Sequence, residues 1–172
     1  MNAQAPIVEW AKADDTSGAD AARREFLTFT LGGEHYGIDI LKVQEIREID
    51  HVTRVPQVVR FVRGVINLRG AIVPIVDLGL MFGFPEPLPL EKASVIVLNA
   101  ERRMVGLVVA SVSDVVGLAE DEILPSPEMG ERSIGRAIAG IGTRRDAGQD
   151  ANATLLLLDV AHVMRRIRED RE

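Results

Sequence analysis

The 172-residue chain contains no cysteine, which excludes a disulfide framework and any metal site built from thiolates. Aromatic residues make up only 4% of it, whereas Val, Ile and Leu dominate, a bias that favours β-strands. No apolar run approaches the roughly 18 residues of a membrane-spanning helix, and residues 1–10 lack the basic start and apolar core of an export signal. We therefore expect a cytoplasmic protein that is not inserted directly into a membrane.

An excess of positive charge is also missing. The formal net charge is −6, and phosphate binding depends on clustered Lys and Arg, so we expect another protein and not nucleic acid as the partner. The 47% of apolar residues are ample for the core of one domain or two small lobes. Only residues 1–24, rich in Ala and Asp, are expected to form a largely disordered tail.

Motifs of catalysis and cofactor binding are missing as well. The three histidines, His35, His51 and His162, lie far apart in the sequence, and none has a second ligand at metal spacing. No glycine-rich phosphate cradle and no nucleophilic serine elbow occurs. Carboxylate pairs such as Asp121 and Glu122 lie in a polar segment, where solvation is expected and not acid–base catalysis. We expect no catalytic residue, cofactor or metal; the rival class is a barrel that binds a small ligand in an apolar pocket.

Residues 64–78 (GVINLRGAIVPIVDL) are the most informative stretch. Apolar residues occupy both alternation sets, which is typical of strands that are buried on both faces. Gly70 can adopt a positive φ at low cost, which predicts a hairpin corner at residues 67–70 with Arg69 at the lip of the sheet.

A proline and an aspartate, Pro74 and Asp77, lie near the end of this stretch. Pro74 lacks the N–H that a sheet ladder uses, which predicts an edge strand or a bulge. Asp77 is expected to end its strand and to cap a short helix at residues 78–82. The prolines in residues 85–89 then predict a stiff, extended linker.

Runs of apolar residues, several of them alternating with polar ones, predict strands in the rest of the chain. The expected strands are residues 26–31, 36–40, 95–100, 104–110, 112–118, 138–141 and 154–158. Residues 43–49 are ambiguous between a helical turn and a bulged strand, residues 58–62 are a short helix candidate, and residues 144–152 are expected to form a polar loop. Apolar residues three and four positions apart predict a C-terminal amphipathic helix at residues 160–172.

The two halves of the chain match when one is shifted by about 69 positions. The shift places residues 36–38 (YGI) over residues 105–107 (VGL) and Glu45 over Asp114. Chance matching of Val and Ile is the alternative to a true duplication. We predict two copies of a five-stranded unit, each closed into a small barrel, with an apolar seam between the barrels.

Two acidic residues and one arginine are the candidate surface residues. Glu45 and Asp114 lie among apolar residues at equivalent points of the two copies, and Arg69 is a lone base at a corner. Arginine is favoured at interfaces because its planar guanidinium group can bind a carboxylate through two hydrogen bonds. From the residues alone, interface and solvated roles for Arg69 and Glu45 both remain open.

From residue 25 to about residue 168 the chain closely resembles the CheW-like family of chemotaxis coupling proteins. The resemblance rests on EFLTFTLGGEHYGIDILKVQEIREI, GVINLRGAIVPIVDL and VIVLNAERRMVGLVVASVSDVVGL, in which NLRG and YGIDILKVQEI are specific. It implies an all-β fold with short helices, in which two SH3-like five-stranded barrels pack side by side. Together with the strand pattern, this suggests a first barrel at about residues 25–84 and a second at about residues 94–160, and leaves open whether strands cross between the lobes.

The activity that the resemblance implies is non-enzymatic. Proteins of this family are adaptors that couple the cytoplasmic tips of methyl-accepting chemoreceptors to the histidine kinase CheA, in arrays at the inner face of the membrane. The kinase contact would involve the CheW-like regulatory domain of CheA and apolar residues at the barrel ends, which we do not place individually. The alternative is a CheW-like module in a chemosensory system that drives pili or another output.

The resemblance also implies a receptor-binding groove. Carried over residue by residue, it falls on Val43, Glu45, Ile46 and Arg69, with Gly106 and Val115 across the seam. The chain departs from the family pattern at residues 58–59, where a proline is frequent, and at residues 47–48, where a glycine is common. Both departures lie beside the groove and leave the receptor preference open.

Overall fold

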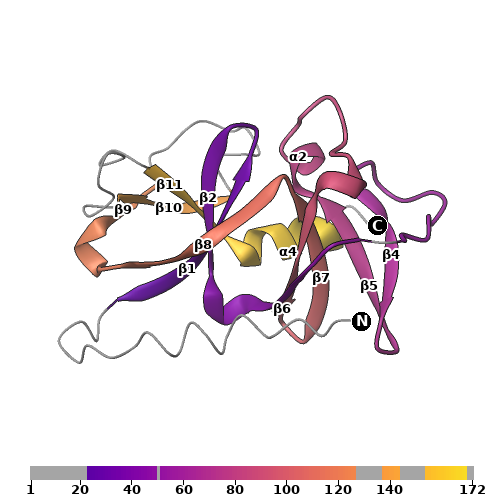
Figure 1. Ribbon diagram of the computed structural model, residues 1–172, viewed down its shortest axis with the longest axis horizontal. Coiled ribbons are helices and arrows are strands. Elements are labelled where there is room, and N and C mark those ends of the chain that lie inside the picture. Colours follow the sequence, from indigo (N-terminus) through magenta and orange to yellow (C-terminus); the bar gives the residue numbers. More distant parts are fainter. Residues whose placement is uncertain (1–22, 50, 127–136, 144–153, 170–172) are drawn as a thin grey trace.

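The computed structural model describes residues 23–49, 51–126, 137–143 and 154–169, which form two β-sheets side by side with a helix between them (Figure 1). Sheet A contains, in spatial order, β8 (Ser111–Leu118), β1 (Arg24–Leu31), β2 (Glu34–Asp39), β11 (Thr154–Leu158), β10 (Ile138–Thr143) and β9 (Ile123–Pro125). Sheet B contains β3 (Val43–Arg47), β6 (Ser94–Ala100), β7 (Arg103–Val109), β5 (Ala71–Asp77) and β4 (Val62–Leu68). The helices are α2 (Leu78–Met81), α4 (Val160–Glu169) and the 3-10 turns η2 (Ile40–Lys42), η3 (Leu90–Lys92) and η4 (Glu120–Glu122).

The two sheets repeat one pattern of strand pairing. In sheet A the β1–β2 hairpin pairs with β8 on one side and, in parallel, with β11 on the other, which is followed by antiparallel β10. In sheet B the β6–β7 hairpin pairs in the same way with β3, β5 and β4. The predicted pairs of equivalent strands therefore occupy equivalent places in the two sheets.

Each sheet combines strands from both halves of the chain. In sheet A the β1–β2 hairpin lies with β8, β9, β10 and β11 of the second copy, and in sheet B the β6–β7 hairpin lies with β3, β4 and β5 of the first copy. The chain changes sheets over very short connections, through η2 between β2 and β3 and through Ala110 between β7 and β8. A boundary between residues 84 and 94 consequently does not separate the sheets, because strands cross between the lobes.

Three apolar clusters hold the sheets together. One lies within sheet B and includes Val95 and Val97, and a second lies within sheet A and includes Leu155 and Leu157. The third, which we call the shared core, joins both sheets and α2 and α4. Neighbouring residues of β6 alternate between these clusters, because successive side chains of a strand point to opposite faces. This is why both alternation sets of the central strands are apolar.

The predicted amphipathic helix is the C-terminal element α4, which lies between the sheets in Figure 1. Its apolar stripe, Val160, Val163, Met164 and Ile167, is buried in the shared core. Asp159 Oδ1 accepts from the backbone N–H of His162 at 3.1 Å, as the predicted capping role requires.

Some local predictions were wrong. Residues 58–62 form turns and the start of β4 and no helix, because β-branched valines disfavour a helical turn and the chain must enter the sheet at Val62. Pro74 lies in an inner strand, yet its missing N–H costs nothing there, since the pairing of β5 with β7 begins only at Ile75. The ambiguous residues 43–49 contain a bulged strand, and the short strand β9 had no recognisable pattern. The predicted disordered tail, except for Arg23 and Arg24, and the polar loop at residues 144–152 lie outside the described residues.

Candidate protein-interaction site

Strand β3 forms one edge of sheet B and carries three of the predicted site residues. Val43 is only 4% exposed and belongs to the shared core, so it anchors the strand and does not face a partner. Glu45 and Ile46 follow a bulge and are half-buried, and Ile46 packs against the rim of the shared core. One acidic and one aliphatic side chain therefore lie on this edge, next to the shared core.

Arg69 reaches this edge from the tip of the β4–β5 hairpin. Its Nη2 donates to Glu45 Oε2 at 2.9 Å. The Arg69 side chain remains 66% exposed, whereas the Glu45 side chain is 19% exposed. Since β3 and β4 are the two ends of the strand order in sheet B, this contact helps to close the sheet into a barrel. The prediction of a lone base was wrong, because Arg69 has a carboxylate partner.

The hairpin tip holds Arg69 in an unusual backbone conformation. Arg69 and Gly70 have φ values of 52° and 92°, the signs that a type I′ turn requires at both central residues. Asn67 Oδ1 accepts from the Gly70 N–H at 2.9 Å and stabilises the turn. For a residue with a Cβ atom this conformation costs roughly 1–2 kcal/mol. An exposed arginine at such a position points to a role for its side chain.

Gly106 does not join this edge, because it lies buried in β7 in the interior of sheet B. A Cβ atom there would lie 2.7 Å from Ile75 Cδ1 and 2.9 Å from Val95 Cγ1. The position therefore needs a glycine for close packing. The sequence did hold a signal for this, since a glycine inside an apolar strand often marks a close approach.

Val115 lies on β8, the counterpart of β3 in sheet A, and packs against the rim of the same shared core as Ile46. Its neighbour Asp114 occupies the position equivalent to Glu45 but binds a hydroxyl and not an arginine. Asp114 Oδ1 lies 2.8 Å from Thr28 Oγ1, and the Asp114 N–H donates to the same hydroxyl at 3.1 Å. In sheet B, by contrast, the equivalent carboxylate of Glu45 binds an exposed guanidinium.

Sequence reasoning missed a second arginine beside Glu45, which lies on β3 itself. Arg47 Nη1 lies 3.6 Å from Glu45 Oε1, so Glu45 is flanked by two guanidinium groups. The two-residue spacing on one strand was the available signal, because residues i and i+2 share a face. The Arg69 contact had no local signal, since the partners lie 24 positions apart.

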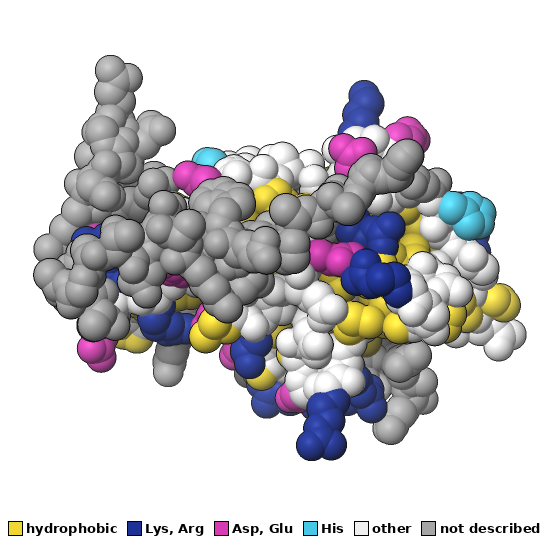
Figure 2. Space-filling view, turned by 60° about the horizontal axis from the view of Figure 1, so that its bottom comes forward, with side chains coloured by type: hydrophobic (Ala, Val, Ile, Leu, Met, Phe, Trp, Pro, Cys, Tyr) yellow, Lys and Arg dark blue, Asp and Glu magenta, His cyan; other side chains and the backbone are white. Residues whose placement is uncertain are grey.

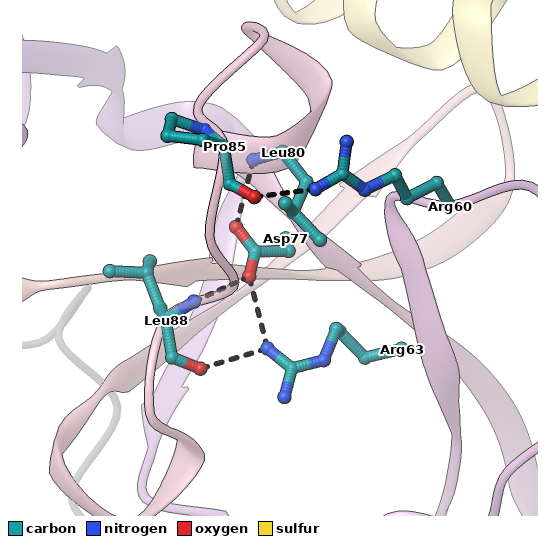
Figure 3. Close-up of polar contacts among 6 residues, drawn as sticks. All are labelled: Arg60, Arg63, Asp77, Leu80, Pro85 and Leu88. Carbon is teal, nitrogen blue, oxygen red and sulfur yellow. Dashed lines mark hydrogen bonds and ion pairs between the residues drawn. The ribbon is translucent and has the colours of Figure 1, made fainter.

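A buried aspartate at the end of β5 organises a network of hydrogen bonds beside the same sheet (Figure 3). The side chain of Asp77 is fully buried and accepts from Arg63 Nη1 at 3.0 Å, from the Leu80 N–H at 3.0 Å and from the Leu88 N–H at 2.9 Å. Arg63 also donates to the Leu88 carbonyl, and Arg60 to the Pro85 carbonyl. The network ties the proline-rich linker to β4 and α2, so that this linker is held against the barrel.

The described residues contain no cluster of His, Asp or Glu that could hold a metal ion. None of the helices within those residues is long and apolar enough to cross a membrane. Burial, and to a lesser degree Glu34, raises the pKa of Tyr36, but this side chain stacks on Phe29 in the shared core.

The β3 edge offers an aliphatic surface and an oriented guanidinium, which suit binding.

The fold and this edge define a two-barrel protein-interaction domain. On the half of the molecule formed by sheet B, Figure 2 shows basic and acidic side chains beside exposed apolar ones. The family model of the CheW-like domain matches residues 25–168. The chain therefore belongs to the CheW-like family, and it is a non-enzymatic coupling adaptor of chemotaxis-type signalling.

Named relatives agree with this assignment. The chain is 50% identical to the chemotaxis protein CheW of Klebsiella aerogenes over 119 residues, which are 69% of this chain and 72% of that protein. It is 36% identical to the chemotaxis protein CheW of Rhizobium meliloti over 124 residues, 70% of this chain and 80% of that protein. The crystal structure of the scaffolding protein TtCheW from Thermoanaerobacter tengcongensis superimposes with a TM-score of 0.70 at 27% identity, over 80% of this chain and 89% of that one.

Proposed function

We propose that the β3 edge, defined as Glu45, Ile46 and Arg69, binds, together with Val115 of β8, the cytoplasmic tip of a chemoreceptor. The observation that carries the proposal is the 66% exposed side chain of Arg69, which an ion pair of 2.9 Å holds on Glu45. Ile46 lies half-buried next to Glu45 on the same strand. A surface of this kind combines apolar area for affinity with one directed charge for orientation.

Apolar burial and hydrogen bonding have different roles in this docking. Aliphatic side chains of a receptor helix pack on Ile46 and on Val115 at the rim of the shared core, and each Å² removed from water contributes about 25 cal/mol. A guanidinium carries five N–H donors, and one is used by Glu45. Arg69 can thus bind a receptor oxygen while its ion pair stays intact.

The receptor packs on the rim and not between the barrels. Val43 is only 4% exposed in the shared core, and Gly106 is buried within sheet B, so neither is accessible to a helix. In this proposal both residues support the edge from behind: Val43 anchors β3, and Gly106 lets β7 pack closely against Ile75 and Val95.

The kinase partner in the proposal is the histidine kinase CheA, through its CheW-like regulatory domain. Family membership and the double-barrel fold support it, because two domains of one fold offer surfaces of similar shape for pairing. Contacts to receptor and kinase together would recruit the adaptor to arrays at the inner face of the membrane.

The test is a binding assay between the full chain and a chemoreceptor cytoplasmic fragment. Arg69→Ala is expected to weaken binding about tenfold, which corresponds to about 1.4 kcal/mol, and to leave the thermal midpoint nearly unchanged because exposed ion pairs stabilise little. Arg54→Ala, which removes another exposed arginine, is the matched control. Unchanged affinity of Arg69→Ala, or a loss of binding that only follows a loss of folding, would refute the role of this edge.

A second variant tests the apolar part of the surface. Val115→Asp places a charge at the rim of the shared core and should lower receptor affinity by a similar factor. Ser113→Asp, an exposed position two residues away on β8, is its control. Equal receptor affinity for Val115→Asp and the wild type would remove Val115 from the site.

A further inference from the structure

A groove separate from the β3 edge lies between the β4–β5 hairpin, β7 and α4. Its volume is about 390 Å³, within the range of ligand-binding pockets, roughly 300–1,000 Å³. Its apolar lining includes Ile72, Met104, Met164 and Ile167. Ile72 is 64% exposed, so the groove presents apolar surface to an occupant.

The same groove has basic residues around it. Arg102, Arg103 and Arg168 all contribute to its lining. Arg168 pairs with Glu101 at 3.4 Å, whereas no carboxylate of the described residues forms an ion pair with Arg102 or Arg103. An occupant that fits would therefore combine apolar and acidic side chains.

The β6–β7 turn beside the groove carries charged residues in a strained backbone conformation. Glu101 and Arg102 have φ values of 53° and 64°, and the equivalent turn of sheet A consists of Gly32 and Gly33. Glycine adopts such angles without strain, whereas a residue with a Cβ atom does not. The chain keeps two charged residues where its own duplicate uses glycines.

We propose that residues 7–15 of this same chain (IVEWAKADD) bind in this groove. This segment lies outside the described residues, and its chemistry matches the lining: Ile7, Val8 and Trp10 are apolar, and Glu9, Asp14 and Asp15 are acidic. The apolar side chains pack on Ile72 and Met104, and the carboxylates pair with Arg102 and Arg103. The inference is independent of receptor binding.

The segment is long enough to reach the groove from its own chain. Trp10 lies thirteen residues before Arg23, where the described chain begins, and that many residues extend to about 43 Å. A domain of about 150 residues has a radius of gyration of about 15 Å, so the linker spans its diameter. A tether of this length also gives an effective concentration of the order of millimolar, which favours this segment over a partner in solution.

Trp10 is the only tryptophan of the chain and reports on the groove directly. We expect the emission of the full-length protein to lie at shorter wavelength than that of a synthetic peptide of residues 1–22, and acrylamide to quench it less. Ile72→Asp should move the emission to that of the peptide, and Arg102→Glu with Arg103→Glu should do so in large part. Leu41→Asp, a change at an 85% exposed aliphatic residue outside the groove, should leave the emission unchanged.

Three results would overturn the proposal. The first is wild-type emission that coincides with that of the peptide, and the second is an Ile72→Asp protein, folded by circular dichroism, with wild-type emission. The third is a shift that depends on protein concentration, since this would assign the groove to the segment of a second copy. Salt at about 1 M, where the Debye length falls to about 3 Å, should weaken but not abolish the shift, because apolar contacts remain.

Discussion

The two barrels share one pattern of strand pairing but differ in their charged residues. In sheet A, Asp114 binds the hydroxyl of buried Thr28, and the β1–β2 turn is made of two glycines. In sheet B, the equivalent Glu45 binds an exposed arginine, and the β6–β7 turn carries Glu101 and Arg102. The two scaffolds are equivalent in strand pairing, and sheet B carries the exposed charges from which we infer binding.

The largest expected effect is a difference in the free energy of unfolding between variants of the two aspartates that precede α2 and α4. Asp77→Ala should lower the free energy of unfolding by about 3 kcal/mol, because it leaves Arg63 without its carboxylate in a mostly buried site. Asp159→Ala removes a cap that has no such arginine and should cost about 1 kcal/mol. Urea unfolding of the two variants measures the difference. Equal losses would show that the Asp77 network adds nothing beyond capping.

The second contrast concerns two equivalent glycines. Gly106→Ala should cost about 2 kcal/mol, since the new methyl group would approach Ile75 and Val95 to within 2.9 Å. At Gly37 in sheet A the nearest contacts would be 3.1 Å and 3.3 Å, so a smaller loss is expected for Gly37→Ala. Thermal unfolding of both proteins gives the comparison. If Gly106→Ala is fully stable and loses receptor binding, the glycine has a direct role in binding that its burial argues against.

Much of this architecture could be predicted from the sequence, and the limits of that prediction have physical causes. Strand positions and the duplication follow from apolar patterning, which is local. The exchange of strands between sheets does not follow from this patterning, because β3 and β8 have similar patterns and either could complete either sheet. The hairpin corner at Arg69 followed from Gly70, whereas the ion pair with Glu45 depends on closure of the barrel.

The third contrast compares the partners of the two equivalent acidic residues, Asp114 and Glu45. We expect the partner of Asp114 to serve stability and the partner of Glu45 to serve binding. Thr28→Val leaves the Asp114 N–H without its hydroxyl partner and should cost about 1–2 kcal/mol of stability. Arg69→Ala should cost less than about 1 kcal/mol, because the ion pair is exposed. Chemical denaturation with a receptor-binding assay on each variant tests this. The reverse order, with Arg69→Ala the less stable protein, would make Arg69 a structural residue.

The smallest effect concerns pH. Burial raises the pKa of Tyr36 above its ordinary value of about 10. The unfolded chain therefore loses this proton first as the pH rises, and stability should fall above about pH 10. Tyr36→Phe should show a shallower decline over the same range in thermal melts. Identical slopes for the two proteins would mean that Tyr36 does not govern alkaline stability.

The most direct test of the binding claim uses the wild-type chain. Amide hydrogen exchange is measured with and without a chemoreceptor cytoplasmic fragment. We predict slower exchange in β3 and at residues 67–71, with little change at the turn of Gly32 and Gly33. Tight binding that leaves β3 unprotected and slows exchange elsewhere would contradict the assignment of this edge as the receptor site.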